Sequence, residues 1–122
     1  MRPEVRFHIR DHDRPSGIAI GPGKIALLEA IRDTGSITSA AKALGMSYRR
    51  AWLLVDETNR CLRRPAVATA AGGRRGGGTA LTKEGAELVR RYRAVERATA
   101  DAVSRRFATL FRARPIAAAR AR

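Results

Sequence analysis

Apolar residues recur every three or four positions along three consecutive stretches between residues 22 and 62, which is the period of amphipathic helices. The first helix is expected to begin at Pro22, because proline suits the first helical turn, and to end near Gly35. Its apolar stripe consists of Ile25, Leu28 and Ile31. We expect this helix to support the two helices that follow it.

The second and third stretches predict a helix-turn-helix between Gly35 and Asn59. Ser36 and Ser47 are placed to cap the two helices, because a serine hydroxyl accepts a hydrogen bond from an amide of the first turn. Gly45 lies between the helices, where a sharp turn requires left-handed backbone. The faces expected to be buried consist of Ile37, Ala40, Ala41 and Leu44 in the first of these helices, and of Ala51, Leu54, Val55 and Thr58 in the second.

The third helix is expected to expose a basic and aromatic surface at its start. The major groove of DNA admits one helix, and arginine and tyrosine side chains in the first turn can reach base edges and phosphates. The candidate DNA contacts of this helix are Ser47, Tyr48, Arg49, Arg50 and Trp52. The alternative is an ordinary pair of packed helices in which Arg49 and Arg50 are only solvated, since helix-turn-helix patterns carry a risk of false positives.

Two short strands are expected before the helices. Val5, Phe7 and Ile9 alternate with polar residues, the period of a strand with one buried face, and residues 18–20 form a return strand. Four residues near the turn have side chains of the kinds that bind metals, namely His8, Asp11, His12 and Asp13. They straddle a strand and its turn, where such polar residues usually satisfy the loop backbone, so we expect no metal site.

A second hairpin is expected directly after the third helix. Residues 67–70 and 79–81 have strand-like composition, and a glycine-rich segment with Arg74 and Arg75 joins them. Such a hairpin is a wing, whose tip can approach phosphates or the minor groove closely. A flexible linker is the alternative. A nucleotide-binding P-loop is excluded, because Gly78 occupies the position of its lysine.

Thr82 is placed to cap a long fourth helix that runs to about Phe111. Its apolar stripe is longer than a small three-helix core can cover, which favours a homodimer through this helix; packing against its own domain is the alternative. The stripe, and the candidate dimerisation surface, consists of Leu88, Tyr92, Val95, Thr99 and Ala102. We therefore divide the chain into a DNA-binding domain at residues 1–81, a dimerisation helix at 82–112 and a disordered basic tail at 113–122.

The net charge of the chain favours a polyanionic partner. Among 122 residues there are 25 lysines and arginines against 11 aspartates and glutamates, a net charge of +14. Basicity alone does not choose between DNA, RNA and other polyanions. Cys61 is the only cysteine, which excludes an intramolecular disulfide. No carboxylate pair or nucleophile–base set stands out, so we expect no enzymatic activity and no cofactor. No apolar run is long enough for a signal peptide or a membrane span, which predicts a cytoplasmic protein.

Several motifs resemble the N-terminal DNA-binding domain of the ModE family of molybdate-responsive transcription regulators, which is related to the LysR-type winged-helix domain. The resemblance covers residues 24–92. Its specific parts are Gly-Ser-Ile-Thr at 35–38, Ala-Ala-Lys at 40–42, Gly-Met-Ser-Tyr-Arg at 45–49, Ala51-Trp52, Asn59, the glycines on both sides of Arg74 and Arg75, Leu81-Thr82 and Gly85. LysR-type domains share the first of these elements, whereas the Ser-Tyr-Arg run and the glycine-rich wing are typical of ModE.

The resemblance implies a mainly α fold with a small β component, a winged helix-turn-helix that dimerises through its long C-terminal helix and binds an inverted repeat in double-stranded DNA. The implied contacts from the first helix of the motif and from the wing are Ser36, Thr38, Lys42, Arg74, Arg75 and Gly76. Members of the family continue into domains that hold molybdate, and this chain ends at Arg122, so molybdate is not expected to bind this chain alone. The alternative function is a nucleoid-type protein that binds RNA or DNA without sequence preference.

Overall fold

The computed structural model describes residues 2–13, 18–69 and 78–112. Within them the helices are α1 (Pro22–Thr34), α2 (Ile37–Ala43), α3 (Tyr48–Cys61) and α4 (Lys83–Phe107). The strands are β1 (Ile9–Arg10), β2 (Ile18–Ile20), β3 (Val67–Thr69) and β4 (Thr79–Leu81), paired as the antiparallel hairpins β1–β2 and β3–β4. This mainly helical fold with a small β component is the one that the sequence predicts. The expected wing tip and the expected tail from residue 113 onward lie outside the described residues.

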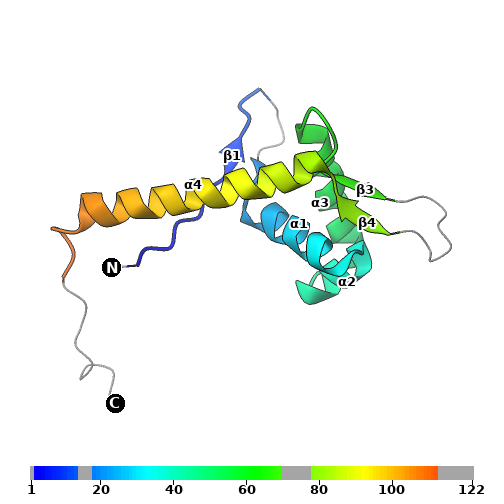
Figure 1. The fold of residues 1–122 in the computed structure, drawn as a ribbon, viewed down its shortest axis with the longest axis horizontal. Helices are drawn as coiled ribbons and strands as arrows, with labels where there is room; N and C mark the ends of the chain where they lie inside the picture. The colour runs from blue at the N-terminus through cyan, green and yellow to red at the C-terminus, as the bar shows by residue number, and fades with distance from the viewer. Residues whose placement is uncertain (1, 14–17, 70–77, 113–122) are drawn as a thin grey trace, which may run out of the picture.

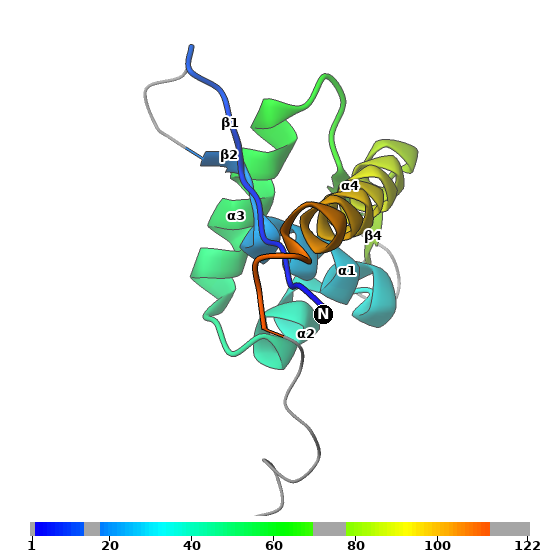
Figure 2. The same cartoon turned by 90° about the vertical axis from the view of Figure 1, so that its left-hand side faces the viewer.

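Helices α1, α2 and α3 pack together as one body, and α4 crosses this body and extends beyond it (Figure 1). The β3–β4 hairpin projects on the side opposite to the free end of α4. Figure 2 shows that the N-terminal segment lies beside α4. The core joins side chains from all four helices and from β3, and its members include Ile25, Leu27, Leu28, Ile31, Ala40, Ala41, Ala51, Val55, Val67, Val89 and Tyr92.

The turn between α2 and α3 forms as its serines and its glycine predict. The Ser36 hydroxyl accepts a hydrogen bond from the Ser39 amide at 2.8 Å, and the Ser47 hydroxyl accepts one from the Arg50 amide at 3.1 Å. Gly45 has a φ of 68°, in the left-handed region that favours glycine. Each of these features is local in sequence, so each helix boundary follows from its own capping residue.

Two apolar residues are exposed although the sequence pattern places them on buried faces, and these two predictions are wrong. Leu44 follows the last residue of α2 with φ −101° and ψ 5°, so its side chain leaves the helical stripe. Ile9 lies where the pairing of β1 with β2 changes register, between Ile9 and Arg10. Val5 and Phe7, which precede β1 on the same alternation, are half-buried, whereas both residues of β1 are exposed, so the expected buried face ends before the hairpin begins.

Phe7 holds the N-terminal segment against α4. Its ring stacks on the Tyr92 ring with 4.1 Å between the centroids, and the Tyr92 hydroxyl donates a hydrogen bond to the Phe7 carbonyl. Tyr92 is only 2% exposed, and Leu88 packs against the same core. The expectation that the stripe of α4 has no cover within its own chain is therefore wrong for these two residues. The first half of α4 packs against its own domain, which was the alternative interpretation of the stripe.

Ion pairs connect α1 to both α4 and α3. The Arg93 guanidinium donates two hydrogen bonds to the Glu29 carboxylate, at 2.6 and 2.9 Å, and one to Glu96 at 2.6 Å. The bonds from Arg93 hold the pKa of Glu29 below its ordinary value. The buried Lys24 ammonium pairs with Glu57 of α3 at 3.0 Å. Helix α1 is thus fixed against two neighbours by charge as well as by apolar contact.

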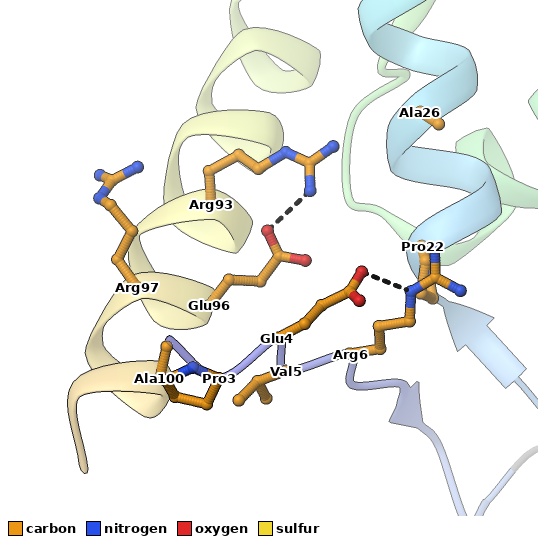
Figure 3. A pocket seen from close by; sticks show the side chains of 10 residues that line it. All are labelled: Pro3, Glu4, Val5, Arg6, Pro22, Ala26, Arg93, Glu96, Arg97 and Ala100. Atoms are coloured by element: carbon orange, nitrogen blue, oxygen red, sulfur yellow. Dashed lines mark hydrogen bonds and ion pairs between the residues drawn. The ribbon is translucent and has the colours of Figure 1, made fainter. Parts of the chain in front are cut away.

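A cavity of about 380 Å³ separates the N-terminal segment from α1 and α4 (Figure 3). Two pairs of its charged side chains neutralise each other, Arg93 with Glu96 and Arg6 with Glu4, the second pair at 3.5 Å. Charges paired in this way attract an added ion only weakly. Each of these pairs lies within one element, Arg6 with Glu4 in the N-terminal segment and Arg93 with Glu96 in α4, and Arg97 also lines the cavity.

The start of α4 contacts the backbone of Ala66 directly. The Thr82 amide donates a hydrogen bond to the Ala66 carbonyl at 2.9 Å, and the Thr82 hydroxyl accepts one from the Gly85 amide at 3.0 Å. A Cβ atom at Gly85 would lie 2.2 Å from the Ala66 carbonyl oxygen. Glycine is therefore the residue that allows the first turn of α4 to lie this close to the chain that enters β3.

Exchanging Gly85 for alanine is expected to lower the free energy of unfolding by about 1–3 kcal/mol, because the added methyl group overlaps the Ala66 carbonyl and forces the two backbones apart. Gly23→Ala is the matched control, since a Cβ atom at Gly23 has no neighbour within 4 Å and alanine favours a helix by roughly 0.5–1 kcal/mol. Urea unfolding followed by circular dichroism measures both variants. Equal stabilities would contradict the close contact.

Candidate nucleic-acid interface

Helix α3 meets different neighbours on its different sides. Its buried side consists of Ala51, Val55 and Thr58. At about 100° per residue, Arg49 and Leu53 lie on the opposite side, and both are exposed. Trp52 lies on the flank toward β3, and Arg50 lies on the flank toward the start of α1. The predicted contact residues therefore cover the free side and both flanks of one helix.

Each flank of α3 borders a crevice. Arg50 lines one of about 400 Å³, together with Pro22 and Gly23 at the start of α1. Trp52 lines the other, of about 190 Å³, together with Val67 of β3. The two neighbouring arginines of α3 are thus separated: Arg49 faces away from the body and lines neither crevice, whereas Arg50 lies beside α1.

The surface of α2 and of the first half of α3 carries positive charge and contains no acidic residue, whereas Glu57, in the second half of α3, lines the same crevice as Arg50. Residues 34–55 and 58–83 contain no aspartate or glutamate, and they include α2, the first half of α3 and the β3–β4 hairpin. Within the part of the chain that the structure describes, the exposed cations Lys42, Arg49 and Arg50 take part in no ion pair. Unpaired cations on one surface produce a local positive potential.

Several acidic residues are neutralised by basic neighbours on their own helix. Glu87 pairs with Arg90 and Arg91 on α4, and hydrogen bonds from these two guanidinium groups lower the pKa of Glu87 to about 2. Asp56, in the second half of α3, pairs with Arg60 at 3.1 Å. These pairs remove positive charge from α4 and from the end of α3 but not from α2 or the start of α3.

The structure places the predicted contact residues of α2 and α3 on two adjoining helices. The exposed ones are Thr38, Lys42, Ser47, Tyr48, Arg49, Arg50 and Trp52. Ser36 is half-buried, and its hydroxyl is engaged in capping α2. The predicted wing contacts Arg74, Arg75 and Gly76 lie outside the described residues.

Asn59 links α3 to the β3–β4 hairpin, a role that sequence reasoning missed. Its side-chain oxygen accepts hydrogen bonds from the Ala66 amide at 2.8 Å and the Val67 amide at 3.2 Å, and its nitrogen donates to the Val67 carbonyl at 3.3 Å. On the other strand, the Thr79 amide donates to the Gly35 carbonyl at 3.0 Å. The hairpin is thereby held in a defined position relative to α2 and α3. The signal in the sequence was an amide side chain near the end of a helix and shortly before a strand.

Helix α2, the left-handed glycine turn, helix α3 and the hairpin that follows define a winged helix-turn-helix protein. Among the described residues, no group of three or more His, Cys, Asp or Glu side chains is placed to hold a metal ion. None of the helices in this part of the chain has the length and apolar composition of a membrane span.

Comparison with known proteins identifies relatives over much of this chain. The molybdenum transport protein ModE of Azotobacter vinelandii is 46% identical over 84 residues, which are 69% of this chain and 31% of the relative. The transcriptional regulator ModE of Yersinia pestis is 42% identical over 92 residues, 75% of this chain and 34% of that protein. The DNA-binding transcriptional dual regulator ModE of Escherichia coli strain K12 is 41% identical over 71 residues, 58% of this chain and 27% of that protein. No family model matches the chain.

Over the matched residues the chain is similar to ModE proteins, the resemblance that its helix-turn-helix and wing motifs predict. It spans about a third of the length of the curated relatives that it matches. The names of these relatives describe longer proteins, so their activities and ligands concern this chain only as proposals.

Replacing Asn59 by alanine is expected to loosen the β3–β4 hairpin from α3. The Ala66 and Val67 amides lose their acceptor, which costs roughly 1–3 kcal/mol of unfolding free energy and accelerates hydrogen exchange at these two amides. Exchange rates measured by NMR give the result amide by amide. Asn59→Asp is the control, because it keeps an acceptor oxygen and is expected to protect both amides better than alanine does. Unchanged exchange in Asn59→Ala would refute the link.

Proposed function

We propose that this chain is a DNA-binding module of a transcription regulator that recognises a specific double-stranded sequence, with α3 in the major groove and the β3–β4 hairpin as a wing on the backbone or minor groove. The observation that carries the proposal is the exposed surface of α2 and the first half of α3, which contains no acidic residue, with Arg49 on the side of α3 that faces away from the core. Unpaired cations attract phosphates, and an arginine in the major groove can donate two hydrogen bonds to guanine.

The placement of the side chains suggests different roles within the proposed interface. Arg49 and Tyr48 are assigned to base edges, because they lie at the free start of α3. Arg50 and Lys42 are assigned to phosphates on either side of the groove. From the sequence, Ser36, Thr38 and Ser47 are assigned to the backbone beside the helix-turn-helix, and Arg74, Arg75 and Gly76 to wing contacts.

The names of two relatives support this role. One is a transcriptional regulator, 42% identical over 92 residues, and the other a DNA-binding transcriptional dual regulator, 41% identical over 71 residues. The proposed role is non-enzymatic, requires no cofactor and is cytoplasmic. That molybdate does not bind this chain alone stays a prediction.

Nucleoid-type binding is the second candidate, and the net charge of +14 favours it. Such a protein would bind random duplex DNA or RNA as tightly as any selected sequence, because phosphate contacts carry no sequence information. The two candidates therefore differ in the ratio of specific to random affinity at moderate salt.

We also infer a homodimer formed through the second half of α4. Val95 is 48% exposed, and the half-buried Thr99 and Ala102 follow it at helical spacing. The C-terminal part of α4 extends beyond the body (Figure 1). Phe107 adds a further exposed apolar side chain. A two-fold dimer would present two copies of α3 to the half-sites of an inverted repeat, about 34 Å or a multiple of this apart.

Val95→Glu is expected to convert the dimer to a monomer, because the substitution places a carboxylate at the proposed apolar contact. Ala86→Glu is the matched control, since it adds the same charge to an exposed position of α4 that lies about 180° around the helix from Val95. Light scattering at micromolar concentration gives the mass of each variant. A monomeric parent protein, or equal masses of the two variants, would remove the argument for a palindromic site.

Arg49→Ala is expected to reduce the preference for an enriched duplex over a scrambled one by about 1–3 kcal/mol, the value of one bidentate contact to guanine. Arg74→Ala and Arg75→Ala should instead weaken both duplexes alike and reduce the log–log salt slope by about 0.9 for each lost phosphate contact. Fluorescence titrations at several salt concentrations measure affinity and slope together. Arg105→Ala, which removes an exposed charge at the end of α4, is the control.

The opposite outcome would reverse these roles. If the Arg74 or Arg75 variant loses preference while Arg49→Ala keeps it, the wing reads sequence, as arginines do in a narrowed minor groove. If every variant and the parent protein bind both duplexes equally, the nucleoid-type candidate is supported instead.

A further inference from the structure

The crevice between α3 and β3 lies between the helix and the hairpin of the proposed interface. Its volume is about 190 Å³. The buried residues that line it are Ile37, Val55 and Val67, and the exposed or half-buried ones are Trp52, Asp56, Asn59 and Thr69. Trp52 is 47% exposed, so one of the largest apolar side chains of the protein is left open to solvent beside a hollow that both apolar and polar side chains line.

We propose that this crevice receives the 5-methyl group of a thymine in the bound duplex, an inference that rests on the proposed DNA binding. Thymine is the base that presents a methyl group in the major groove, whereas the other bases present polar atoms there. Trp52 lies within one turn of Arg49 on α3, so a base contacted by Arg49 and a base beside Trp52 belong to the same stretch of groove.

The charge of the crevice argues against a phosphate as its occupant. Asp56 is the only charged residue among those that line it, and it already pairs with Arg60, so no lining side chain attracts a phosphate. An apolar group needs no such attraction, because it removes apolar surface of Trp52 and Val67 from water. The hollow therefore differs in kind from the cationic surface formed by Lys42, Arg49 and Arg50.

The experiment exchanges thymine for uracil, one position at a time, in a duplex enriched for binding. Deoxyuridine lacks only the methyl group, so at the thymine that fills the crevice we expect affinity to fall about fourfold, the value of one buried methyl group. In Trp52→Ala the same exchange should have no effect. Leu53→Ala is the matched control: it removes a similarly exposed apolar side chain, 41% exposed, that does not line the crevice, and it should keep the fourfold response.

A second readout uses the parent protein. Trp52 is the only tryptophan in the sequence, so its fluorescence reports on the crevice alone. At saturating DNA, the emission should differ between the duplex with thymine and the duplex with uracil at the responsive position, and should be the same for uracil exchanges elsewhere.

The outcomes separate this inference from the proposed function. If no thymine responds to the exchange, or if the response persists in Trp52→Ala, while the enriched duplex is still preferred over a scrambled one, the crevice does not hold a thymine methyl group and sequence-specific binding stands. If the enriched duplex is not preferred at all, the proposed function fails and this inference fails with it.

Discussion

Three structural elements meet at the backbone of Ala66. Its amide donates to Asn59 at the end of α3, and its carbonyl accepts from Thr82 at the start of α4. Gly85 lacks the side chain that would otherwise keep α4 at a distance. Because both backbone groups of one residue are engaged by different helices, the position of the hairpin, of α3 and of α4 is set at a single point. The geometry of the proposed interface depends on this contact more than on any single exposed side chain.

The same contact would connect the proposed DNA recognition to the proposed dimerisation. Helix α4 is fixed at its start by Gly85 and farther along by Tyr92 and Arg93, whose partners are Phe7 and Glu29. Its free half therefore leaves the body in a direction that is set relative to α3. In a dimer formed through that half, the separation of the two α3 helices would follow from this direction, and so would the spacing of the half-sites. A substitution near residue 85 would then alter the spacing of the half-sites, although residue 85 is not part of the proposed DNA interface.

Interactions within a few residues were predicted, and those between distant parts of the chain were not. The caps of Ser36 and Ser47 are confirmed, because each bond joins residues three apart and depends on one turn of helix. The Tyr92–Phe7 contact joins residues 85 apart and exists only once α4 lies against the N-terminal segment. The candidate site could also be predicted only in part. Helical periodicity places the start of α3 at the surface, but which neighbour each flank of α3 meets is decided by the packing of α1 and β3.

The acidic residues also bear on the choice between specific and random binding. Most of the ion pairs described lie on α1, α4 or the second half of α3, where they connect helices or neutralise arginines, and they leave α2 and the start of α3 cationic. Asp56 and Glu57 are the acids nearest to the proposed interface, since Asp56 lines the crevice beside Trp52 and Glu57 lines the crevice beside Arg50. A protein that binds any duplex through phosphates gains from every cation and loses from every carboxylate near the DNA, whatever the sequence. In the proposed complex these two carboxylates hold Arg60 and Lys24 in ion pairs, so neither cation is free to add random affinity, and more of the binding free energy is left to base contacts.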